Sequence, residues 1–117
     1  MSAVRRGDVY RILFGQSKGH EPKDPHYAVV VQSDAYPLST TLVVPLSSSA
    51  TPTPWRVPVD IMGRRTYALV EQLRAVDAES RLREWVCSIA GTDEMSQIDE
   101  ELAMILGTHP AYKDSSQ

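Results

Sequence analysis

The chain has 117 residues, which fits one domain and leaves no room for two. Hydrophobic residues make up 42% and charged residues 23%, a balance typical of a globular protein. The net charge of −3 disfavours a protein that holds nucleic acid by bulk positive charge. However, residues 1–74 carry nine basic and six acidic side chains, whereas residues 75–117 carry three and nine. The first two thirds of the chain can therefore still face a polyanion.

Simple features of the sequence argue against further classes of protein. No apolar run approaches the roughly 18 residues that span a bilayer, so we expect no transmembrane helix and no membrane partner. The N-terminal residues show no apolar stretch like that of a secretory signal. Cys87 is the single cysteine, and no Cys/His set has the spacing of zinc ligands. We therefore expect a cytoplasmic protein without metal or cofactor, in which Cys87 is a small core or interface residue.

The first two thirds of the chain predict a set of about six short β-strands, because β-branched and aromatic runs alternate with polar turns. The predicted strands are Asp8–Phe14, Tyr27–Gln32, Thr40–Leu46, Trp55–Asp60, Tyr67–Leu73 and Glu84–Ile89. The second is nearly continuous in β-branched residues, as expected for a strand buried on both faces. Pro45 lacks an N–H, so it must lie at an edge, a bulge or a free ladder position. This spacing is typical of an antiparallel sheet or a small barrel.

The last third of the chain changes to a helical period. Apolar residues recur at intervals of three and four and predict an amphipathic helix from about Asp93 to Leu106. The apolar stripe consists of Met95, Ile98, Leu102, Ile105 and Leu106. Thr92 is the predicted N-cap and Gly107 the predicted C-terminal stop. We expect one domain over residues 1–107 and a flexible tail over residues 108–117.

The outer face of this helix is acidic. Asp99, Glu100 and Glu101 fall on it together. The face is either a solvated surface or a docking surface for a basic partner.

Chemically useful side chains concentrate at two strand boundaries, although no strong catalytic motif is present. His26 precedes the second predicted strand and Ser47 follows the third. If these strands pair as antiparallel neighbours, the two residues meet at one end of the sheet. A histidine beside a hydroxyl can move protons near neutral pH. The alternative is a loop histidine next to a serine-rich turn.

The order of several short segments resembles the MazF/PemK family of toxins from bacterial toxin–antitoxin pairs. The resemblance covers residues 6–107. The segments that carry it are Arg6-Gly7-Asp8-Val9-Tyr10, Gly19-His20-Glu21, Ala28-Val29-Val30-Val31-Gln32-Ser33-Asp34, Val43-Val44-Pro45-Leu46-Ser47, Glu71-Gln72-Leu73-Arg74-Ala75-Val76-Asp77 and Leu106-Gly107. It implies a mainly β fold with a C-terminal α-helix, a small and partly open antiparallel β-barrel. It also implies a toxin that is a sequence-specific, metal-independent endoribonuclease and cuts single-stranded RNA through attack of the 2′-hydroxyl, leaving a 2′,3′-cyclic phosphate.

The resemblance assigns roles to individual residues. The expected catalytic residues are His26, Ser47 and Arg74, and the expected substrate-binding residues are Gly19, His20, Glu21, Lys23, Gln72, Trp55 and Arg56. The resemblance itself points to Gly19, Glu21, Ser47, Gln72 and Arg74. Trp55 and Arg56 are expected from the residues alone, because they follow a flexible loop. Ser47 falls on the family's Thr/Ser position, whereas His26 stands where the family usually has an arginine. Either His26 performs the same cyclisation as an acid and base, with Arg74 or Lys23 supplying positive charge, or the chain cuts slowly or not at all.

The resemblance also implies partners. These are single-stranded RNA, a second copy of the chain in a homodimer, and a MazE-like antitoxin that lays an acidic C-terminal segment across the groove. The alternative is a catalytically silent module that binds protein, as CcdB does with the same barrel. Apart from the resemblance, the residues themselves place Arg64 and Arg65 in a turn, where they either contact phosphate or are simply solvated.

Overall fold

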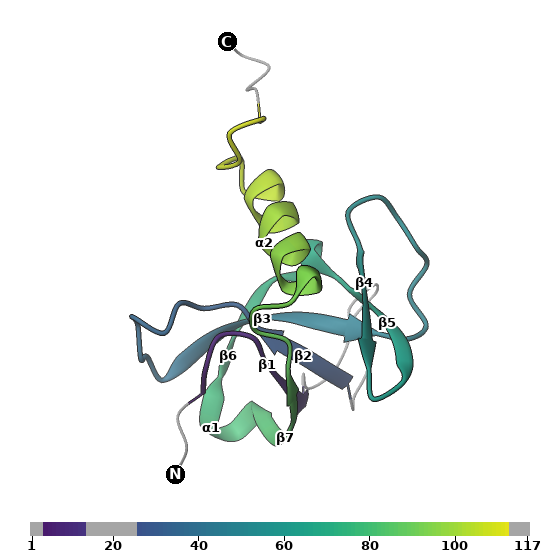
Figure 1. Ribbon diagram of the computed structural model, residues 1–117. Helices are drawn as coiled ribbons and strands as arrows, with labels where there is room; N and C mark the ends of the chain where they lie inside the picture. The colour runs from purple at the N-terminus through teal and green to yellow at the C-terminus, as the bar shows by residue number, and fades with distance from the viewer. Residues whose placement is uncertain (1–3, 14–25, 113–117) are drawn as a thin grey trace.

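The β-branched runs of the sequence form strands in the computed structural model, which describes residues 4–13 and 26–112. The strands are β1 (Asp8–Ile12), β2 (His26–Val30), β3 (Thr40–Ser47), β4 (Val57–Ile61), β5 (Arg64–Ala68), β6 (Arg74–Asp77) and β7 (Leu82–Ser88). The helices are a 3₁₀ turn η1 (Val70–Gln72), a short α1 (Ala78–Arg81) and α2 (Asp93–Ile105), as Figure 1 shows. In the part of the chain described, no helix has the length and apolar character needed to cross a membrane.

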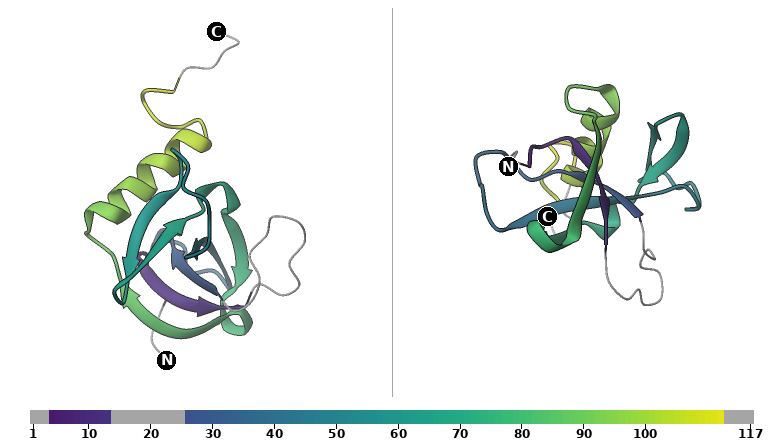
Figure 2. Two further views of the ribbon diagram at one scale, coloured as in Figure 1. Left: turned by 90° about the vertical axis from the view of Figure 1, so that its right-hand side faces the viewer. Right: turned by 90° about the horizontal axis from the view of Figure 1, so that it is seen from below.

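The strands form one antiparallel sheet in the order β4-β5-β3-β2-β1-β7, and β6 pairs with the first half of β3. The sheet curls into a half-barrel, which is clearest in the left view of Figure 2. The predicted fold class, mainly β with a partly open barrel and a C-terminal helix, is therefore confirmed.

Pro45 lies at the point where β3 changes its neighbour. Residues Thr40 to Val43 pair with β6, whereas Leu46 and Ser47 pair with β5. Pro45 falls in the gap between the two partners, so its missing N–H costs no bond on that side. Its carbonyl oxygen accepts a hydrogen bond from the N–H of Leu69, 2.9 Å away. The change of partner thus gives Pro45 a position without a ladder hydrogen bond on that side, as the sequence predicted.

The prediction of one strand over Tyr67–Leu73 is wrong. The structure divides this segment among the end of β5, the 3₁₀ turn η1 and the residue before β6. Ala68, Leu69 and Val70 are all buried, although successive residues of a half-buried strand alternate between its faces. The 3₁₀ turn η1 follows β5 directly and leads the chain to β6. Both strands pair with β3, β6 along its first half and β5 at its end.

The apolar core lies on both faces of the central strands. Val29 and Val30 are neighbours on β2 and are 0% and 1% exposed, which confirms burial on both sides. One cluster includes Val9, Val29, Val44 and Leu46 and packs against α2. Tyr10, Ala28, Val30 and Val43 belong to the other cluster. Cys87 packs against the first cluster, and its burial raises the pKa of the thiol, as fits a core residue.

Helix α2 begins as predicted, with Thr92 Oγ1 accepting a hydrogen bond from the N–H of Met95. Gly107 follows its end with φ of +74°. Met95, Ile98 and Leu102 are buried. Ile105 and Leu106 were expected on the same buried stripe, but they are 48% and 60% exposed. The reason is visible in Figure 1, where the C-terminal end of α2 extends beyond the sheet.

Candidate functional site

A cleft of about 480 Å³ opens at the end of the sheet where β2 begins and β3 ends. Its lining residues come from β1, β2, β3, β5 and the residue after β3. They are Arg11, His26, Tyr27, Leu46, Ser48, Arg64 and Thr66. Among the residues that the structure describes, the lining thus contains two arginines, a histidine, a tyrosine, a serine and a threonine, and no carboxylate. Such a set suits an anionic ligand.

The strand register explains why these residues meet. Arg11 on β1 lies directly across from Tyr27 on β2, and Tyr27 lies across from Leu46 on β3. Side chains of directly opposed residues share one face of a sheet, so the three form a row. Leu46 is 1% exposed and closes the floor, whereas Tyr27 is 37% exposed at the surface. An aromatic side chain therefore stands beside an arginine at the mouth of the cleft.

The β4–β5 hairpin supplies the opposite wall. Met62 and Gly63 form its two-residue turn with φ of +53° and +79°, the positive angles that a type I′ turn requires. Arg64 follows the turn, across from the buried Ile61, and lines the cleft.

Arg65, the next residue, is engaged elsewhere. Its Nε donates to Asp60 Oδ1 at 2.6 Å, and this contact lowers the pKa of the Asp60 carboxyl. Because neighbouring strand residues point to opposite faces, the pair Arg64-Arg65 divides into one arginine in the cleft and one bound to a carboxylate.

His26 and Ser47 come from adjacent strands, as the sequence predicted, since β2 and β3 are antiparallel neighbours. The register that pairs Tyr27 with Leu46 brings His26 across from Ser47. Ser47 is only 6% exposed, and its Oγ accepts a hydrogen bond from the N–H of Ser49 at 3.3 Å. Ser47 is not among the residues that line the cleft with His26, whereas the next serine, Ser48, is.

The other sequence-predicted residues lie in several places. Arg74 is across from Val43, four residues before Ser47 on β3, which is about 13 Å along the strand. Gln72 lies in η1. Neither belongs to the lining of the cleft. Gly19, His20, Glu21 and Lys23 fall outside the residues that the structure describes.

The Arg56 side chain is held by hydrogen bonds within the protein. Its Nε and Nη2 donate to Glu71 Oε2 at 3.1 and 2.7 Å, and its Nη1 donates to the carbonyl oxygen of Thr51 at 2.8 Å. These bonds join the segment before β4 to η1. Trp55 beside it is 43% exposed, as a ligand-contacting aromatic requires, but it is not among the residues that line the cleft.

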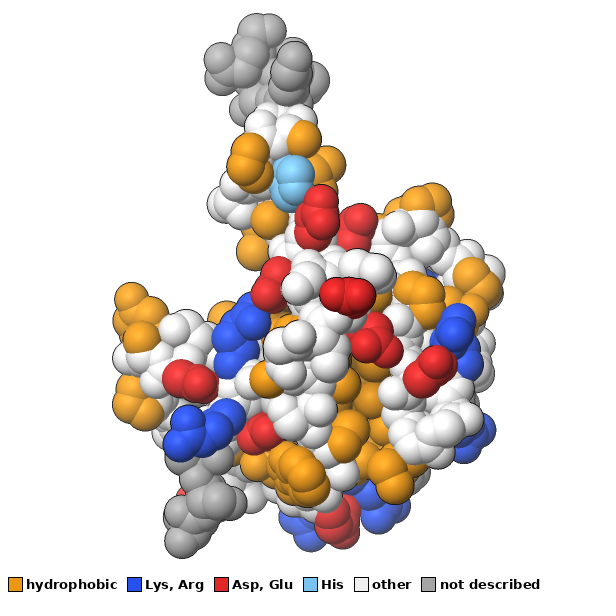
Figure 3. All heavy atoms as spheres, viewed as in Figure 1, with side chains coloured by type: hydrophobic (Ala, Val, Ile, Leu, Met, Phe, Trp, Pro, Cys, Tyr) orange, Lys and Arg blue, Asp and Glu red, His pale blue; other side chains and the backbone are white. Residues whose placement is uncertain are grey.

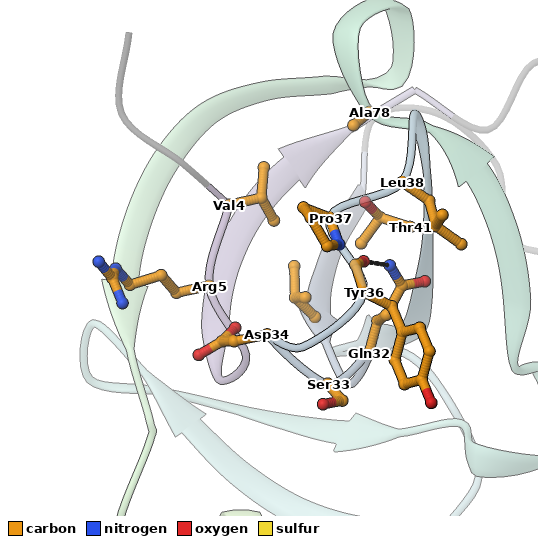
Figure 4. Close-up of a pocket in the computed structure, with 11 residues that line it drawn as sticks. Val4, Arg5, Gln32, Ser33, Asp34, Tyr36, Pro37, Leu38, Thr41 and Ala78 are labelled. Carbon is orange, nitrogen blue, oxygen red and sulfur yellow. Dashed lines mark hydrogen bonds between the residues drawn. The ribbon is translucent and has the colours of Figure 1, made fainter.

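A second cavity, of about 390 Å³, lies at the other end of the β2–β3 pair. Figure 4 shows that the loop after β2 folds over it. Gln32 fastens this loop, because its Nε2 donates to the carbonyl oxygen of Tyr36 and its Oε1 accepts from the N–H of Leu42. Asp34 accepts from the N–H of Arg6. The polar groups here hold the loop, and the side chain of Arg5 points away from the cavity in Figure 4.

The charges are separated in space as well as in sequence. Figure 3 shows acidic side chains gathered along α2. Asp99 on this helix is bound to Arg6, and Glu100 is in contact with His109 Nε2 at 3.3 Å. The cleft is lined by arginine and histidine. The net charge of −3 therefore says little about the ligand of the cleft. Within residues 4–13 and 26–112, no three His, Cys, Asp or Glu side chains come together in a group that could hold a metal ion.

Comparison with known proteins defines the class of the chain. The sequence model of the PemK-like, MazF-like toxins of type II toxin–antitoxin systems matches residues 5–106. A Mycobacterium tuberculosis protein named "Putative toxin" is 37% identical over 105 residues, which is 89% of this chain and 98% of that protein. The chain therefore belongs to the PemK-like, MazF-like toxin family of type II toxin–antitoxin systems.

Solved structures share the fold. MazF from Deinococcus radiodurans superposes with a TM-score of 0.79 at 23% identity, covering 92% of this chain and 99% of that one. An endoribonuclease in complex with its cognate antitoxin, from a mycobacterial species, gives a TM-score of 0.74 at 19% identity, covering 90% and 96%. At these identities the likeness establishes the half-barrel alone.

Proposed function

We propose that this toxin is an endoribonuclease that cuts single-stranded RNA without a metal ion, and that the cleft at the start of β2 is its active site. The observation that carries the proposal is the position of His26, which lines a cleft with Ser48, Arg11 and Arg64. A histidine supplies the proton transfer that RNA cyclisation needs, and arginines supply charge for the phosphate. The endoribonuclease among the fold relatives supports the same activity.

The reaction requires one proton transfer at each end of the phosphate. His26 in its neutral form takes the proton of the 2′-hydroxyl as the 2′ oxygen bonds to phosphorus. The bond from phosphorus to the 5′ oxygen breaks, and the imidazolium returns its proton to that leaving oxygen. The Ser48 hydroxyl donates a hydrogen bond to the phosphate oxygens, where negative charge increases in the transition state, and the arginines attract the RNA backbone to the cleft. The products are a 2′,3′-cyclic phosphate and a free 5′-hydroxyl.

The proposed partner in the cell is an antitoxin with an acidic segment. Solved MazE–MazF complexes from Deinococcus radiodurans support this pairing. A cleft lined by two arginines and a histidine attracts carboxylates as well as phosphates, so an acidic segment there excludes RNA. We also expect a homodimer, which sedimentation of the purified chain measures directly.

The test is cleavage of a long unstructured RNA in the presence of EDTA, with mapping of the new ends. We expect cyclic phosphate ends from the wild-type chain and a loss of at least about 100-fold in rate with His26→Ala, the size of a general acid–base contribution. Arg83→Ala, an exposed change on β7 away from the cleft lining, is the control and should cut normally. Intact RNA over several sequences contradicts the nuclease and favours the module that binds protein.

A further inference from the structure

We propose that Arg11 and Arg64 clamp successive phosphates of the RNA on either side of Tyr27, and that a nucleobase stacks on the Tyr27 ring. This inference rests on the proposed function, because it names the residues that hold the substrate of the same cleft. Neither arginine belongs to the residues that the family resemblance points to. Both lie in the cleft only because the strands bring them together.

Both arginines are available to bind a ligand. Arg11 forms an ion pair with Glu84 at 3.7 Å, and the two side chains are 48% and 67% exposed. A pair so long and so exposed contributes little and yields readily to a phosphate. Arg64 is exposed, and among the described residues no carboxylate forms an ion pair with it. Three other arginines are already held by carboxylates. They are Arg6 with Asp99, Arg56 with Glu71 and Arg65 with Asp60.

The sheet places the two arginines on either side of Tyr27. Arg11, Tyr27 and Leu46 form one row on the face that carries the core cluster of Val9, Val29 and Val44. Leu46 lies across from Ala68 on β5, and Arg64 is four residues before Ala68 on the same face. The order across the cleft is therefore arginine, tyrosine and arginine. Each arginine stands on a strand rather than on a loop, so the ladder fixes the separation of their backbones, with Arg64 about 13 Å along β5 from Ala68.

The chemistry of the cleft favours RNA as its ligand. Two separated guanidinium groups suit a polyanion with regularly repeated charges, and an acidic peptide offers these as well as RNA does. Tyr27 favours RNA, since single-stranded nucleic acids commonly stack their bases on exposed aromatic rings between phosphate contacts. None of the described lining residues is a carboxylate that would repel the RNA backbone.

The experiment separates binding from cleavage. The probe is a fluorescent single-stranded RNA with 2′-O-methyl groups throughout, which lacks the attacking hydroxyl and stays intact, and its anisotropy is measured with the full chain over a range of salt. We expect Arg11→Gln and Arg64→Gln each to weaken binding about tenfold, and to reduce the slope of log K against log salt by about 0.7. Tyr27→Leu should weaken binding and leave that slope unchanged, because stacking releases no counterions.

The control is Arg65→Gln, which removes the same charge one residue away, on the opposite face of β5. We expect it to bind within about twofold of the wild-type chain, since Arg65 is held by Asp60. Thermal unfolding checks that every variant folds. Wild-type affinity in Arg11→Gln and Arg64→Gln overturns the clamp, and so does an equal loss in Arg65→Gln. Binding of polyglutamate but not of RNA overturns it as well.

The outcomes distinguish this inference from the proposed function. Arginine-dependent binding of the methylated RNA, with no cleavage of ordinary RNA, supports the clamp and contradicts the nuclease. Cleavage of ordinary RNA with an unchanged KM in Arg11→Gln and Arg64→Gln supports the nuclease and contradicts the clamp.

Discussion

Arg6, two residues before β1, forms an ion pair with Asp99 on α2 and thereby fastens the last helix to the first strand. Its Nε also donates to the carbonyl oxygen of Val31 at 3.1 Å, and its backbone N–H donates to Asp34 at 2.8 Å. One residue thus joins the N-terminus, the end of β2 and α2. One interpretation of the sequence makes the acidic face of α2 a solvated surface. The structure differs at Asp99, because this carboxylate is bound to Arg6 within the same chain.

Arg6→Ala should lower the free energy of unfolding by about 1–2 kcal/mol, because it removes the ion pair and leaves the Val31 carbonyl without its donor. Asp99→Asn should cost less, about 0.5 kcal/mol, since the Asp99 side chain is 42% exposed and solvent screens the pair. Urea unfolding measures both values. A larger loss for Asp99→Asn than for Arg6→Ala contradicts this ranking.

Gly7 should be far less tolerant of a side chain than Gly63. Both have positive φ, +92° and +79°. A Cβ on Gly7 would lie 2.7 Å from the Cβ of Ala90, whereas a Cβ on Gly63 meets nothing within 4 Å. Gly63→Ala therefore carries only the backbone strain of about 1 kcal/mol, and Gly7→Ala should cost at least about 2 kcal/mol. Equal thermal stability of the two variants would show that β1 and the end of β7 move apart freely.

Arg56→Gln should destabilise the protein without changing the charge of the cleft. The Arg56 side chain is 18% exposed and makes three hydrogen bonds, so we expect a loss of about 1–2 kcal/mol in the free energy of unfolding. Affinity for the methylated RNA, measured below the unfolding temperature, should stay within about twofold. A tenfold loss of affinity with normal stability would instead confirm the substrate-binding role that the sequence suggested.

Asp77 gives the protein a predictable response to acid. The Ser80 side chain and backbone N–H both donate to its carboxylate, at 2.7 and 2.8 Å, and hold its pKa below the ordinary value. Because the folded state favours the ionised form, this contribution to stability is present above the unfolded pKa of about 3.9 and is lost as the pH falls through the lower folded pKa. The stability difference between wild type and Asp77→Ala should therefore shrink between about pH 5 and pH 2. A difference that is constant over this range would show that the cap does not depend on the charge of Asp77.

Much of the fold follows from local patterns in the sequence. The valine-rich runs predict β2 and β3, and the helical period with Thr92 and Gly107 predicts α2 and both of its ends. The pattern fails between Tyr67 and Leu73, because β3 exchanges β5 for β6 there. That change of partner depends on pairing between strands that are far apart in the sequence. The local pattern of apolar residues in the segment therefore does not predict it.

The candidate site shows the same division. The sequence placed His26 and Ser47 at one end of two strands, and the pairing of β2 with β3 confirms that they are neighbours. The sequence analysis did not predict Arg11 as a site residue. Arg11 lies two residues after Val9 on β1, and this spacing puts it on the face of the strand that carries the core. Arg64 could not be distinguished from Arg65, because only the register with Ile61 and Asp60 separates their faces.

The state of the RNA ends after incubation with the purified chain in EDTA shows whether His26 carries out the cleavage. We predict 2′,3′-cyclic phosphate ends with the wild-type chain and almost none with His26→Ala, while both proteins bind the methylated RNA equally well. Cleavage by His26→Ala at the wild-type rate would remove His26 from the chemistry and contradict the assignment of this cleft as the active site.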